Sequence, residues 1–497
     1  MEHPRLRRDV TDVSYDYPEK VLQIGEGNFI RAFADWMIHQ CNKQGLFKGT
    51  VVATQPREKG ALKIKTLADQ DGLFTLIERG LKQNQPFENT QVIASISKVI
   101  NPYVEWQQFL CLADNPNIEW IISNTTEAGI RYVEETLDWK KPIHSFPGKI
   151  AALLYRRYQS PHRDKGFNIL PCELLERAGD ELQAIVLRHS DDWQLEADFK
   201  RWVQEQNVFL NSLVDRIVTG YPADEIHAIE RQLGYTDKML TVAEPYHQWV
   251  IEGNDDIAEQ LPFHKAGLNV EWVKDISPYV KRKVRVLNGA HTFMVPIAYL
   301  NGIDIVRDAV SDSKVRSKVM CFLEEVVAPT LPFSEDELNV YIAQTVERFE
   351  NPYIDHQLLD IALNMISKFT SRIYPTLIDF VQVHGHVPDV LTESMAYLVR
   401  YYRCERDTED WRGWRYVNGT VEYYPLRDDE DVLVAFQHAW GMFEKGGRLR
   451  PVVETILSNE KVWGCSFERD LHGTWSDLVD HVTLHLEQII QNEKAGL

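Results

Sequence analysis

The first half of the chain alternates short apolar runs with amphipathic segments. Five runs rich in β-branched residues are typical of buried strands: residues 21–24, 50–54, 73–77, 92–96 and 118–123. After the first run, apolar positions recur at steps of three and four and predict a helix with one apolar face: Phe29, Phe33, Trp36, Met37 and Cys41. Gly45 is typical of the end of such a helix. Strands that alternate with helices predict a mostly parallel sheet with crossover connections, which is an α/β fold.

Helical patterns dominate the chain after about residue 275. Before that point, strand-like runs continue at residues 169–172, 213–217 and 244–251, and helical patterns occur at residues 103–112 and 179–207. Long helical patterns then take over: residues 290–300, 314–327, 335–349, 356–381, 391–400 and 476–491. We expect Pro375 to break one of these helices, and the charged segment 405–431 to be a solvated connection. The sequence therefore predicts an α/β domain at residues 1–265 and a mostly α-helical domain at residues 266–497.

Composition narrows the class of protein. With 497 residues, of which 44% are hydrophobic and 26% charged, the chain has the mix of a globular protein of about two domains. The formal net charge of -20 argues against nucleic acid or an anionic membrane as a partner. A local group of Arg and Lys can still bind a small anion, so an anionic substrate is not excluded.

Cysteine usage and apolar run lengths bear on the compartment. The six cysteines are scattered and form no Cys-x-x-Cys pair, which is typical of a reduced, intracellular protein without a zinc cluster. The N-terminal segment has no apolar core, so we expect no signal peptide. No run of about 18 apolar residues is present, so we expect no membrane span. These features predict a cytoplasmic protein and leave its oligomeric state open.

The turn Gly25-Glu26-Gly27-Asn28-Phe29-Ile30 stands between the first strand and the first helix. Glycine there allows a tight turn and lets backbone N–H groups approach a pyrophosphate at the helix N-terminus. Ile30 replaces the third glycine of the usual dinucleotide pattern, and an ordinary αβ turn is the alternative. The acidic residue expected after the second strand is also missing. Gln55 can bind a ribose and Arg57 can approach a 2′-phosphate, so this turn leaves NAD versus NADP open.

A second polar loop, residues 123–129, follows the strand-like run 118–123. In an open parallel sheet, ligands bind beyond the carboxyl ends of the strands, so Thr125, Thr126 and Glu127 can line the nicotinamide-ribose site. The alternative is a polar loop that caps a helix.

The segment 280–292 has the highest concentration of side chains that are suited to catalysis. Reduction of a carbonyl needs a proton donor and groups that stabilise the developing oxyanion. Lys283 is a candidate proton donor, because burial or nearby cations such as Lys281, Arg282 and Arg285 can lower the pKa of a lysine. In an α-helix, His291 would lie ~80° and Asn288 ~140° around the axis from Lys283, on one side. The alternative is a basic, solvated helix start.

Several segments in a consistent order resemble the mannitol dehydrogenase family, the polyol-specific long-chain dehydrogenases. The Lys-x4-Asn-x2-His pattern of Lys283, Asn288 and His291 occurs with the Gly25-x-Gly27-x-Phe29-x-Arg31 turn. Further matching segments extend the resemblance along nearly the whole chain: residues 171–174, 211–217, 287–292, 348–352 and 364–369.

The resemblance implies a Rossmann-type N-terminal domain, a mostly helical C-terminal domain, a site between them, NAD as cofactor and no zinc. It implies that Lys283 is the general acid/base and that Asn288 and His291 bind and polarise the substrate oxygen. The cofactor-binding set that we predict follows: Gln23, Ile24, Gly25, Glu26, Gly27, Asn28, Phe29, Arg31, Gln55, Thr125, Thr126 and Glu127. An oxyanion-binding Asn that follows a Cys-Asp pair in mannitol dehydrogenases is absent, because the matching run here is Cys172-Glu173-Leu174.

The substrate that the resemblance implies is a hexuronate, with D-tagaturonate reduced to D-altronate in hexuronate catabolism. An anionic substrate calls for cations, and the candidates for binding it follow: Asp215, Arg348, His356, Lys368 and Arg372. Asp215 can instead orient Lys283, and the alternative is a buried ion pair with Arg216 or another cation. We expect the basic pocket at residues 281–285 and 348–372. Fructuronate or a mannitol-type polyol is the alternative substrate, and a dinucleotide-sensing protein without catalysis is the alternative function.

Overall fold

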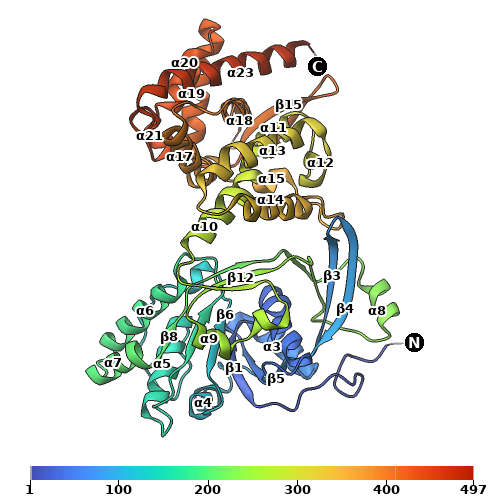
Figure 1. Ribbon diagram of the computed structural model, residues 1–497, viewed down its shortest axis with the longest axis vertical. Helices are drawn as coiled ribbons and strands as arrows, with labels where there is room; N and C mark the ends of the chain where they lie inside the picture. Colours follow the sequence, from blue (N-terminus) through green and yellow to red (C-terminus); the bar gives the residue numbers. More distant parts are fainter. Residues whose placement is uncertain (1–2, 409, 496–497) are drawn as a thin grey trace. The chain divides into compact units, whose positions relative to one another are not determined.

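The structure is a computed structural model that describes residues 3–408 and 410–495. The chain divides into two units, Met1–Ile276 and Ser277–Leu497, coloured from blue to green and from yellow to red in Figure 1. Unit 1 is an α/β domain and unit 2 is mostly helical, which confirms the predicted fold class.

The centre of unit 1 is a six-stranded parallel sheet. Its spatial order is β5 (Ile96–Ile100), β2 (Thr50–Thr54), β1 (Glu19–Ile24), β6 (Trp120–Ser123), β7 (Asn168–Pro171) and β8 (Val208–Phe209). Numbered along the chain within this sheet, the order is 3-2-1-4-5-6, which is that of the doubly wound dinucleotide-binding fold. The order reverses between β1 and β6, so the crevice for a ligand is expected at the carboxyl ends of these two strands.

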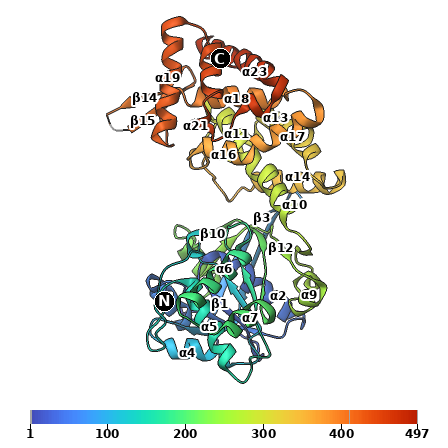
Figure 2. The same ribbon diagram turned by 90° about the vertical axis from the view of Figure 1, so that its left-hand side faces the viewer.

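Helices cover both faces of this sheet, because successive side chains of each strand point to opposite sides. Leu22 and Ile24 of β1 pack with a layer of four helices: α4 (Trp106–Cys111), α5 (Phe146–Gln159), α6 (Ala178–Asp192) and α7 (Ala197–Gln206). Val21 packs on the other side with the helical run that follows β1, which comprises α1 (Asn28–Ile30), a π-helical turn (Arg31–Asp35) and α2 (Trp36–Lys43). Figure 2 shows α5, α6 and α7 together over the sheet. The run ends as predicted, with Gly45 at a positive φ of 66°.

Two smaller sheets complete unit 1. One has the order β10 (Val218–Gly220), β11 (Thr241–Ala243), β3 (Phe74–Lys82) and β4 (Gln85–Ile93), and the other β13 (Val270–Val273), β12 (Gln248–Glu252) and β9 (Ser212–Asp215). The remaining helices are α3 (Ala61–Asp69), α8 (Ile226–Leu233) and α9 (Asp255–Gln260).

We expected the runs 73–77 and 92–96 to be two strands of the parallel sheet, and this prediction is wrong. β3 and β4 form an antiparallel hairpin around Gln83 and Asn84, whose φ angles are 55° and 58°, the values of a type I′ turn. The run 92–96 spans the end of β4 and the start of β5, so it joins two sheets. The predicted helix 179–207 is likewise two helices, because the chain turns at Gln194 with a φ of 53°.

Unit 2 packs its helices around one continuous core. Its α-helices are α10 (Ser277–Lys283), α11 (Gly289–Leu300), α12 (Val306–Ser311), α13 (Ser313–Cys321), α14 (Glu335–Phe349), α15 (Leu358–Ile361), α16 (Met365–Arg372), α17 (Tyr374–His384), α18 (Asp389–Tyr401), α19 (Glu430–Gly446), α20 (Arg450–Leu457), α21 (Glu460–Trp463), α22 (Phe467–Asp470) and α23 (Trp475–Ala495). Pro375 lies in the first turn of α17, so the break predicted there is confirmed. None of the helices in the described part is long and apolar enough to cross a bilayer.

The charged segment 405–431 is structured, contrary to the prediction of a solvated connection. It contains an antiparallel sheet of β14 (Cys404–Asp407), β15 (Asp410–Val417) and β16 (Thr420–Pro425). Buried and partly exposed residues alternate along β15, with Trp411, Gly413 and Arg415 buried. The many charged side chains of the segment made this alternation hard to recognise in the sequence. The Asn418-Gly419 turn, a strong hairpin signal in the sequence, has positive φ angles of 50° and 75°.

Candidate active site

The glycine turn after β1 and the polar loop after β6 lie together at the switch point of the sheet. The N–H of Gly25 donates to Thr54 O at 2.8 Å, and the N–H of Asn124 donates to Ile24 O at 3.0 Å. Gly25 has a φ of 137°, and a Cβ atom there would lie 2.6 Å from the Asn124 carbonyl oxygen. Only glycine therefore fits this position, and the two predicted loops are brought into direct contact.

The helical run that begins at Asn28 offers unpaired backbone N–H groups to an anion. Its N-cap residue, Gly27, has no side chain to cap them, and a Cβ atom at Gly27 would meet nothing within 4 Å. The run continues through the π-helical turn to Lys43, so its dipole favours negative charge at the turn. This open helix N-terminus next to a close backbone approach fits the pyrophosphate of a dinucleotide.

Arg31 shapes this turn from behind. Its Nε donates to Glu26 O at 3.2 Å, its Nη2 donates to Asn28 Oδ1 at 2.7 Å, and its Nη1 donates to Met239 O. Burial lowers the pKa of Arg31 to about 10. The side chain is enclosed by the protein, and its hydrogen bonds to Glu26 O and Asn28 Oδ1 hold the turn.

The other residues predicted around the turn lie at different depths. Gln23 and Ile24 are buried in β1, whereas Phe29 is half-buried and stacks on Phe33 with ring centroids 5.0 Å apart. Gln55 is buried at the end of β2 and donates from Nε2 to Glu58 O at 3.3 Å. Glu26 approaches the same corner, and its burial raises the pKa of its carboxyl group.

Glu173 holds the polar loop after β6, a role that the sequence analysis did not assign. The carboxylate accepts hydrogen bonds from Ser123 Oγ at 3.0 Å, from Thr125 N at 2.8 Å and from Thr125 Oγ1 at 3.0 Å. Burial raises the pKa of Glu173, and these donors oppose that effect. Thr125 thus faces Glu173, while Thr126 is exposed and the side chain of Glu127 lies outside the described part. The signal in the sequence was an acid directly after a buried strand.

In unit 2, Lys283, Asn288 and His291 lie on one helical run with a π-helical turn, η6 (Val284–Asn288), at its middle. The N–H of Gly289 donates to Val284 O, five residues back. The α-helical spacing predicted from the sequence is therefore wrong here. One wider turn absorbs about one extra residue, which brings the three side chains within roughly 60° of arc instead of ~140°.

Exposure along this run singles out the same residues. From Arg282 to Leu300, partial exposure is confined to Lys283, Val284, Asn288 and His291, and every other residue is buried. Three of these four residues are polar, so one narrow polar face interrupts an apolar helix. Such a face, adjacent to a π-helical turn, is typical of a functional site.

The cations expected to assist Lys283 are engaged elsewhere. Lys281 Nζ and Arg285 Nη1 lie 3.1 Å and 2.8 Å from Asp379 Oδ2. Burial would raise the pKa of Asp379, but hydrogen bonds from these two cations keep it below its ordinary value. Arg282 lies over three aromatic rings, with 4.3 Å to the centroid of Tyr341. Residues 281–285 therefore do not provide the basic pocket that we expected, apart from Lys283 itself.

The end of α14 and the loop after it lie beside His291. The ring centroids of His291 and Phe349 are 4.4 Å apart, and those of His291 and His356 are 5.3 Å apart in an edge-to-face arrangement. Arg348 is buried at the end of α14. Burial lowers the pKa of His356, which favours the neutral imidazole.

Helix α16 adds two cations to this group. Arg372 Nη1 donates to Thr292 Oγ1 at 3.2 Å, and Thr292 follows His291 in the sequence. Lys368, one turn earlier, donates to Ile361 O at 2.8 Å. Burial lowers the pKa of both groups, and the charge of Arg372 lowers that of Lys368 further. Within residues 3–408 and 410–495, no carboxylate forms an ion pair with either cation.

Asp215 belongs to unit 1, where it is buried at the end of β9. The ion pair that the sequence suggested for Arg216 is formed with a different acid, because Arg216 Nη2 lies 2.6 Å from Glu78 Oε1. Arg216 also donates to Ala32 O at 2.6 Å and to Glu244 O at 3.0 Å.

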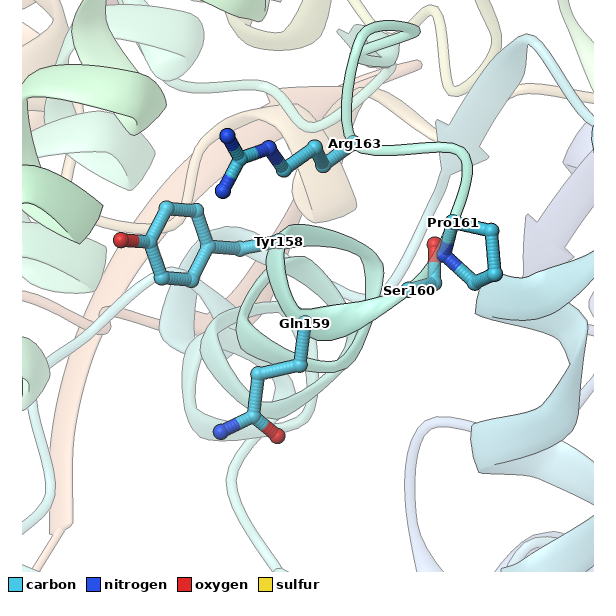
Figure 3. Close-up of a pocket in the computed structure, with 5 residues that line it drawn as sticks. All are labelled: Tyr158, Gln159, Ser160, Pro161 and Arg163. Carbon is cyan, nitrogen blue, oxygen red and sulfur yellow. The ribbon is translucent and has the colours of Figure 1, made fainter.

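A hollow elsewhere in unit 1 contains none of the predicted residues. It lies at the end of α5, has a volume of about 610 Å³ and is lined by Tyr158, Gln159, Ser160, Pro161 and Arg163 (Figure 3). Figure 3 shows these side chains pointing in different directions, so they do not form a converging set of polar groups. Among the described residues, no group of three or more His, Cys, Asp or Glu side chains is arranged to hold a metal ion.

Known protein families match both units. The family described as "Mannitol dehydrogenase Rossmann domain" matches residues 19–265, and the "Mannitol dehydrogenase C-terminal domain" matches residues 275–412. An altronate oxidoreductase of Halalkalibacterium halodurans is 41% identical over 482 residues, which cover 96% of this chain and 92% of that protein. The altronate oxidoreductase of Bacillus subtilis is 41% identical over 487 residues, which cover 98% and 95%.

Solved structures agree at the level of the fold. A substrate-free D-sorbitol dehydrogenase aligns over 99% of both chains with a TM-score of 0.79 and 21% identity. The mannitol 2-dehydrogenase of Pseudomonas fluorescens, in a ternary complex with NAD and D-mannitol, aligns over 99% of this chain and 98% of that chain with a TM-score of 0.66 and 20% identity. Because both domain families match and the altronate oxidoreductases align along nearly the whole length, the chain belongs to the mannitol dehydrogenase family.

Proposed function

We propose that the protein catalyses the NADH-dependent, reversible reduction of D-tagaturonate to D-altronate. The relatives named altronate oxidoreductase support this substrate, at 41% identity over nearly the whole chain. The observation that carries the proposal is the pair of cations on α16, Lys368 and Arg372, which have no ion-pair partner in the described part of a chain of net charge -20. Two half-buried cations one turn apart repel each other, and an anionic ligand bound by both would remove this repulsion.

The polar face of unit 2 has the groups that carbonyl reduction needs. Bound NADH supplies the hydride to the keto carbon of the substrate. Lys283 donates a proton to the carbonyl oxygen, which becomes the new hydroxyl group, and acts as the base in the reverse direction. The amide of Asn288 and the imidazole of His291 hold that oxygen by hydrogen bonds and stabilise its developing charge.

The carboxylate of the substrate is held by a group of polar side chains in unit 2. Arg372, Lys368 and Arg348 supply hydrogen-bond donors with positive charge, and the neutral imidazole of His356 adds a hydrogen bond. Asp215 of unit 1 is our remaining candidate for a substrate contact. An anionic substrate fits Lys368 and Arg372 better than a neutral polyol does, because a neutral polyol would leave these two half-buried charges without a counter-charge.

Cofactor binding is assigned to unit 1. The Gly25–Gly27 turn and the helix N-terminus at Asn28 hold the pyrophosphate, with Gln55 near the adenosine ribose and Thr125, Thr126 and Glu127 near the nicotinamide ribose. We take NAD(H) as the cofactor and the cytoplasm as the location of the reaction.

One assay tests the proposal. NADH absorbance is followed with D-tagaturonate, D-fructuronate and D-fructose in parallel, with NADPH as the comparison for cofactor choice. We expect the largest kcat/KM with D-tagaturonate. Faster turnover of fructuronate would instead make the protein a mannonate-forming enzyme, and faster turnover of fructose would overturn the role given to Lys368 and Arg372. NADH binding without turnover of any of the three would favour a dinucleotide-sensing protein.

A further inference from the structure

An acid and an amide are buried together directly behind the dinucleotide turn. Gln23 of β1 and Asp35 of the π-helical turn are both fully buried, and Gln23 Nε2 donates to Asp35 Oδ2 at 3.1 Å. The same amide also donates to the carbonyl oxygen of Gly25 at 3.0 Å. The pair is thus linked by one hydrogen bond to the first glycine of the turn.

Each of the two side chains has one oxygen atom left over. Gln23 Oε1 and Asp35 Oδ1 are buried and have no hydrogen-bond partner. Both atoms are acceptors when Asp35 is ionised, so neither can satisfy the other, and leaving buried polar atoms unpaired is costly. A proton on Asp35 Oδ1 removes the conflict, because the hydroxyl group then donates to Gln23 Oε1. The two side chains would form a closed acid–amide ring with two hydrogen bonds.

The surroundings favour that proton. Burial raises the pKa of Asp35 to about 8, against smaller opposing contributions from Gln23 and from Arg31 on the same helical run. Arg216 reaches this run at Ala32 O, but its charge is paired with Glu78. The neighbouring strand β11, Thr241–Ala243, carries no titratable side chain. Arg31 is therefore the cation that acts on Asp35, and it does not compensate the cost of burial.

We propose that Asp35 is a neutral acid at physiological pH and that its closed pair with Gln23 is a positioning device for the dinucleotide turn. The pair fixes the Gly25 carbonyl through Gln23 Nε2, so the backbone N–H groups of the turn keep their direction. The proton also keeps a negative charge away from a turn that has to accept a pyrophosphate. This inference rests on the proposed binding of NADH to unit 1, but it does not depend on the identity of the sugar acid.

The test compares Asp35→Asn with Asp35→Leu and the wild-type chain. Asn has the shape and hydrogen-bonding groups of the protonated acid, because its Nδ2 can donate to Gln23 Oε1 while its Oδ1 accepts from Gln23 Nε2. Leu can form neither bond. The dissociation constant of NADH is measured by fluorescence titration from pH 6 to pH 9.5 for all three proteins.

At pH 7 we expect Asp35→Asn to bind NADH as tightly as the wild type does, and Asp35→Leu to bind about tenfold more weakly, the change expected for losing about one hydrogen bond. Above pH 8 the wild-type affinity should fall, whereas that of Asp35→Asn should stay level. Equal pH profiles for the wild type and Asp35→Asn would overturn the proposal, even if Asp35→Leu does not fold. Weakened binding by Asp35→Asn at pH 7 would also overturn it.

Unfolding of the cofactor-free chain gives an independent readout. The folded state binds the Asp35 proton up to about pH 8, whereas the unfolded chain releases it near the ordinary value of about 3.9. The melting temperature of the wild type relative to Asp35→Asn should therefore fall as the pH rises between these values and level off above them. If this difference appears but no protein binds NADH, the proposed cofactor is wrong and the acid–amide pair stands. If this pH-dependent difference in melting temperature does not appear, Asp35 is not a neutral acid and the proposed acid–amide pair is wrong.

Discussion

At the scale of single residues, the site of unit 2 is defined by which cations have a partner within the fold. Lys281 and Arg285 share the carboxylate of Asp379, which lies 98 residues from Lys281 along the chain. Lys368 and Arg372 have no such acid in the described residues. The sequence shows the charges of all four residues, but it does not show which of them meet a carboxylate in the fold. The local pattern predicted Lys283, Asn288 and His291 as a group, whereas the division of the surrounding cations required the structure.

Removal of the proposed proton donor is the first test at this scale. We expect Lys283→Ala to lower kcat by about 10²–10⁴-fold, the range for losing a general acid, while the dissociation constant of NADH stays within about twofold. The matched control is Lys281→Ala, because Lys281 lies two residues before Lys283 and its ammonium group pairs with Asp379. Steady-state kinetics and NADH fluorescence measure both quantities. Near-normal turnover by Lys283→Ala would rule out the acid/base assignment.

Removal of one anion-binding cation should act on substrate affinity instead. Arg372→Ala loses a charge-assisted hydrogen bond to the carboxylate, so KM for D-tagaturonate should rise by about 10–100-fold while kcat changes less. Arg372→Lys should recover part of the loss, because it keeps the charge but not the planar guanidinium. Arg450→Ala on the exposed face of α20 is the control for the change in net charge. An unchanged KM in Arg372→Ala would place the carboxylate elsewhere.

At the scale of elements, helices and turns set the geometry that the residues need. The π-helical turn at Val284–Asn288 narrows the polar face, and its presence was not predictable because its side chains follow no pattern different from an α-helix. The β15–β16 hairpin could have been predicted from Asn418-Gly419 and the alternation before it. The high charge of the segment 405–431 suggested a solvated connection instead, but a strand with one exposed face can also carry many charged side chains.

This segment also carries a residue that holds α16 in place. Asp428 Oδ2 accepts a hydrogen bond from Tyr402 Oη and one from the N–H of Ile366 at 3.3 Å, in the first turn of α16. The N–H of Asn364, the N-cap residue, donates to Arg427 O at 3.1 Å. The loop before α19 therefore anchors the N-terminus of the helix that presents Lys368 and Arg372.

Asp428→Ala should loosen this anchor. We expect KM for D-tagaturonate to rise by about three- to tenfold and the melting temperature to fall, because one partly buried acceptor and one helix-terminal bond are lost. Asp428→Asn should restore part of both, since its amide oxygen can still accept from Ile366. The control is Asp429→Ala, which alters the exposed neighbour. If the melting temperature falls in Asp428→Ala without any change in KM, the anchor is structural and does not position the cations.

At the scale of the whole molecule, fold class and charge act together. The alternation of strands and helices predicted a parallel sheet. It did not predict the spatial order of the strands, which reverses between β1 and β6 and places both polar loops at one crevice. The net charge of -20 opposes an anionic substrate and an anionic cofactor at long range, whereas in the proposed site Lys368 and Arg372 would attract the substrate at short range. The repulsion acts over a longer distance than the attraction, so increasing ionic strength screens the repulsion first.

The predicted consequence is a maximum in the salt dependence of kcat/KM for D-tagaturonate. The Debye length falls from about 30 Å at 0.01 M to about 8 Å at 0.15 M, so salt first screens the repulsion by the whole chain, and kcat/KM should rise about two- to fivefold. Near 1 M, where the Debye length is about 3 Å, salt also screens Lys368 and Arg372, and kcat/KM should fall again.

The measurement uses saturating NADH, so that only the sugar acid is limiting. In Arg372→Ala the decline at high salt should be shallower, because one of the screened attractions is already gone. A steady decrease from the lowest salt onward would mean that the local cations dominate at every distance and that the overall acidity has no influence on capture of the substrate.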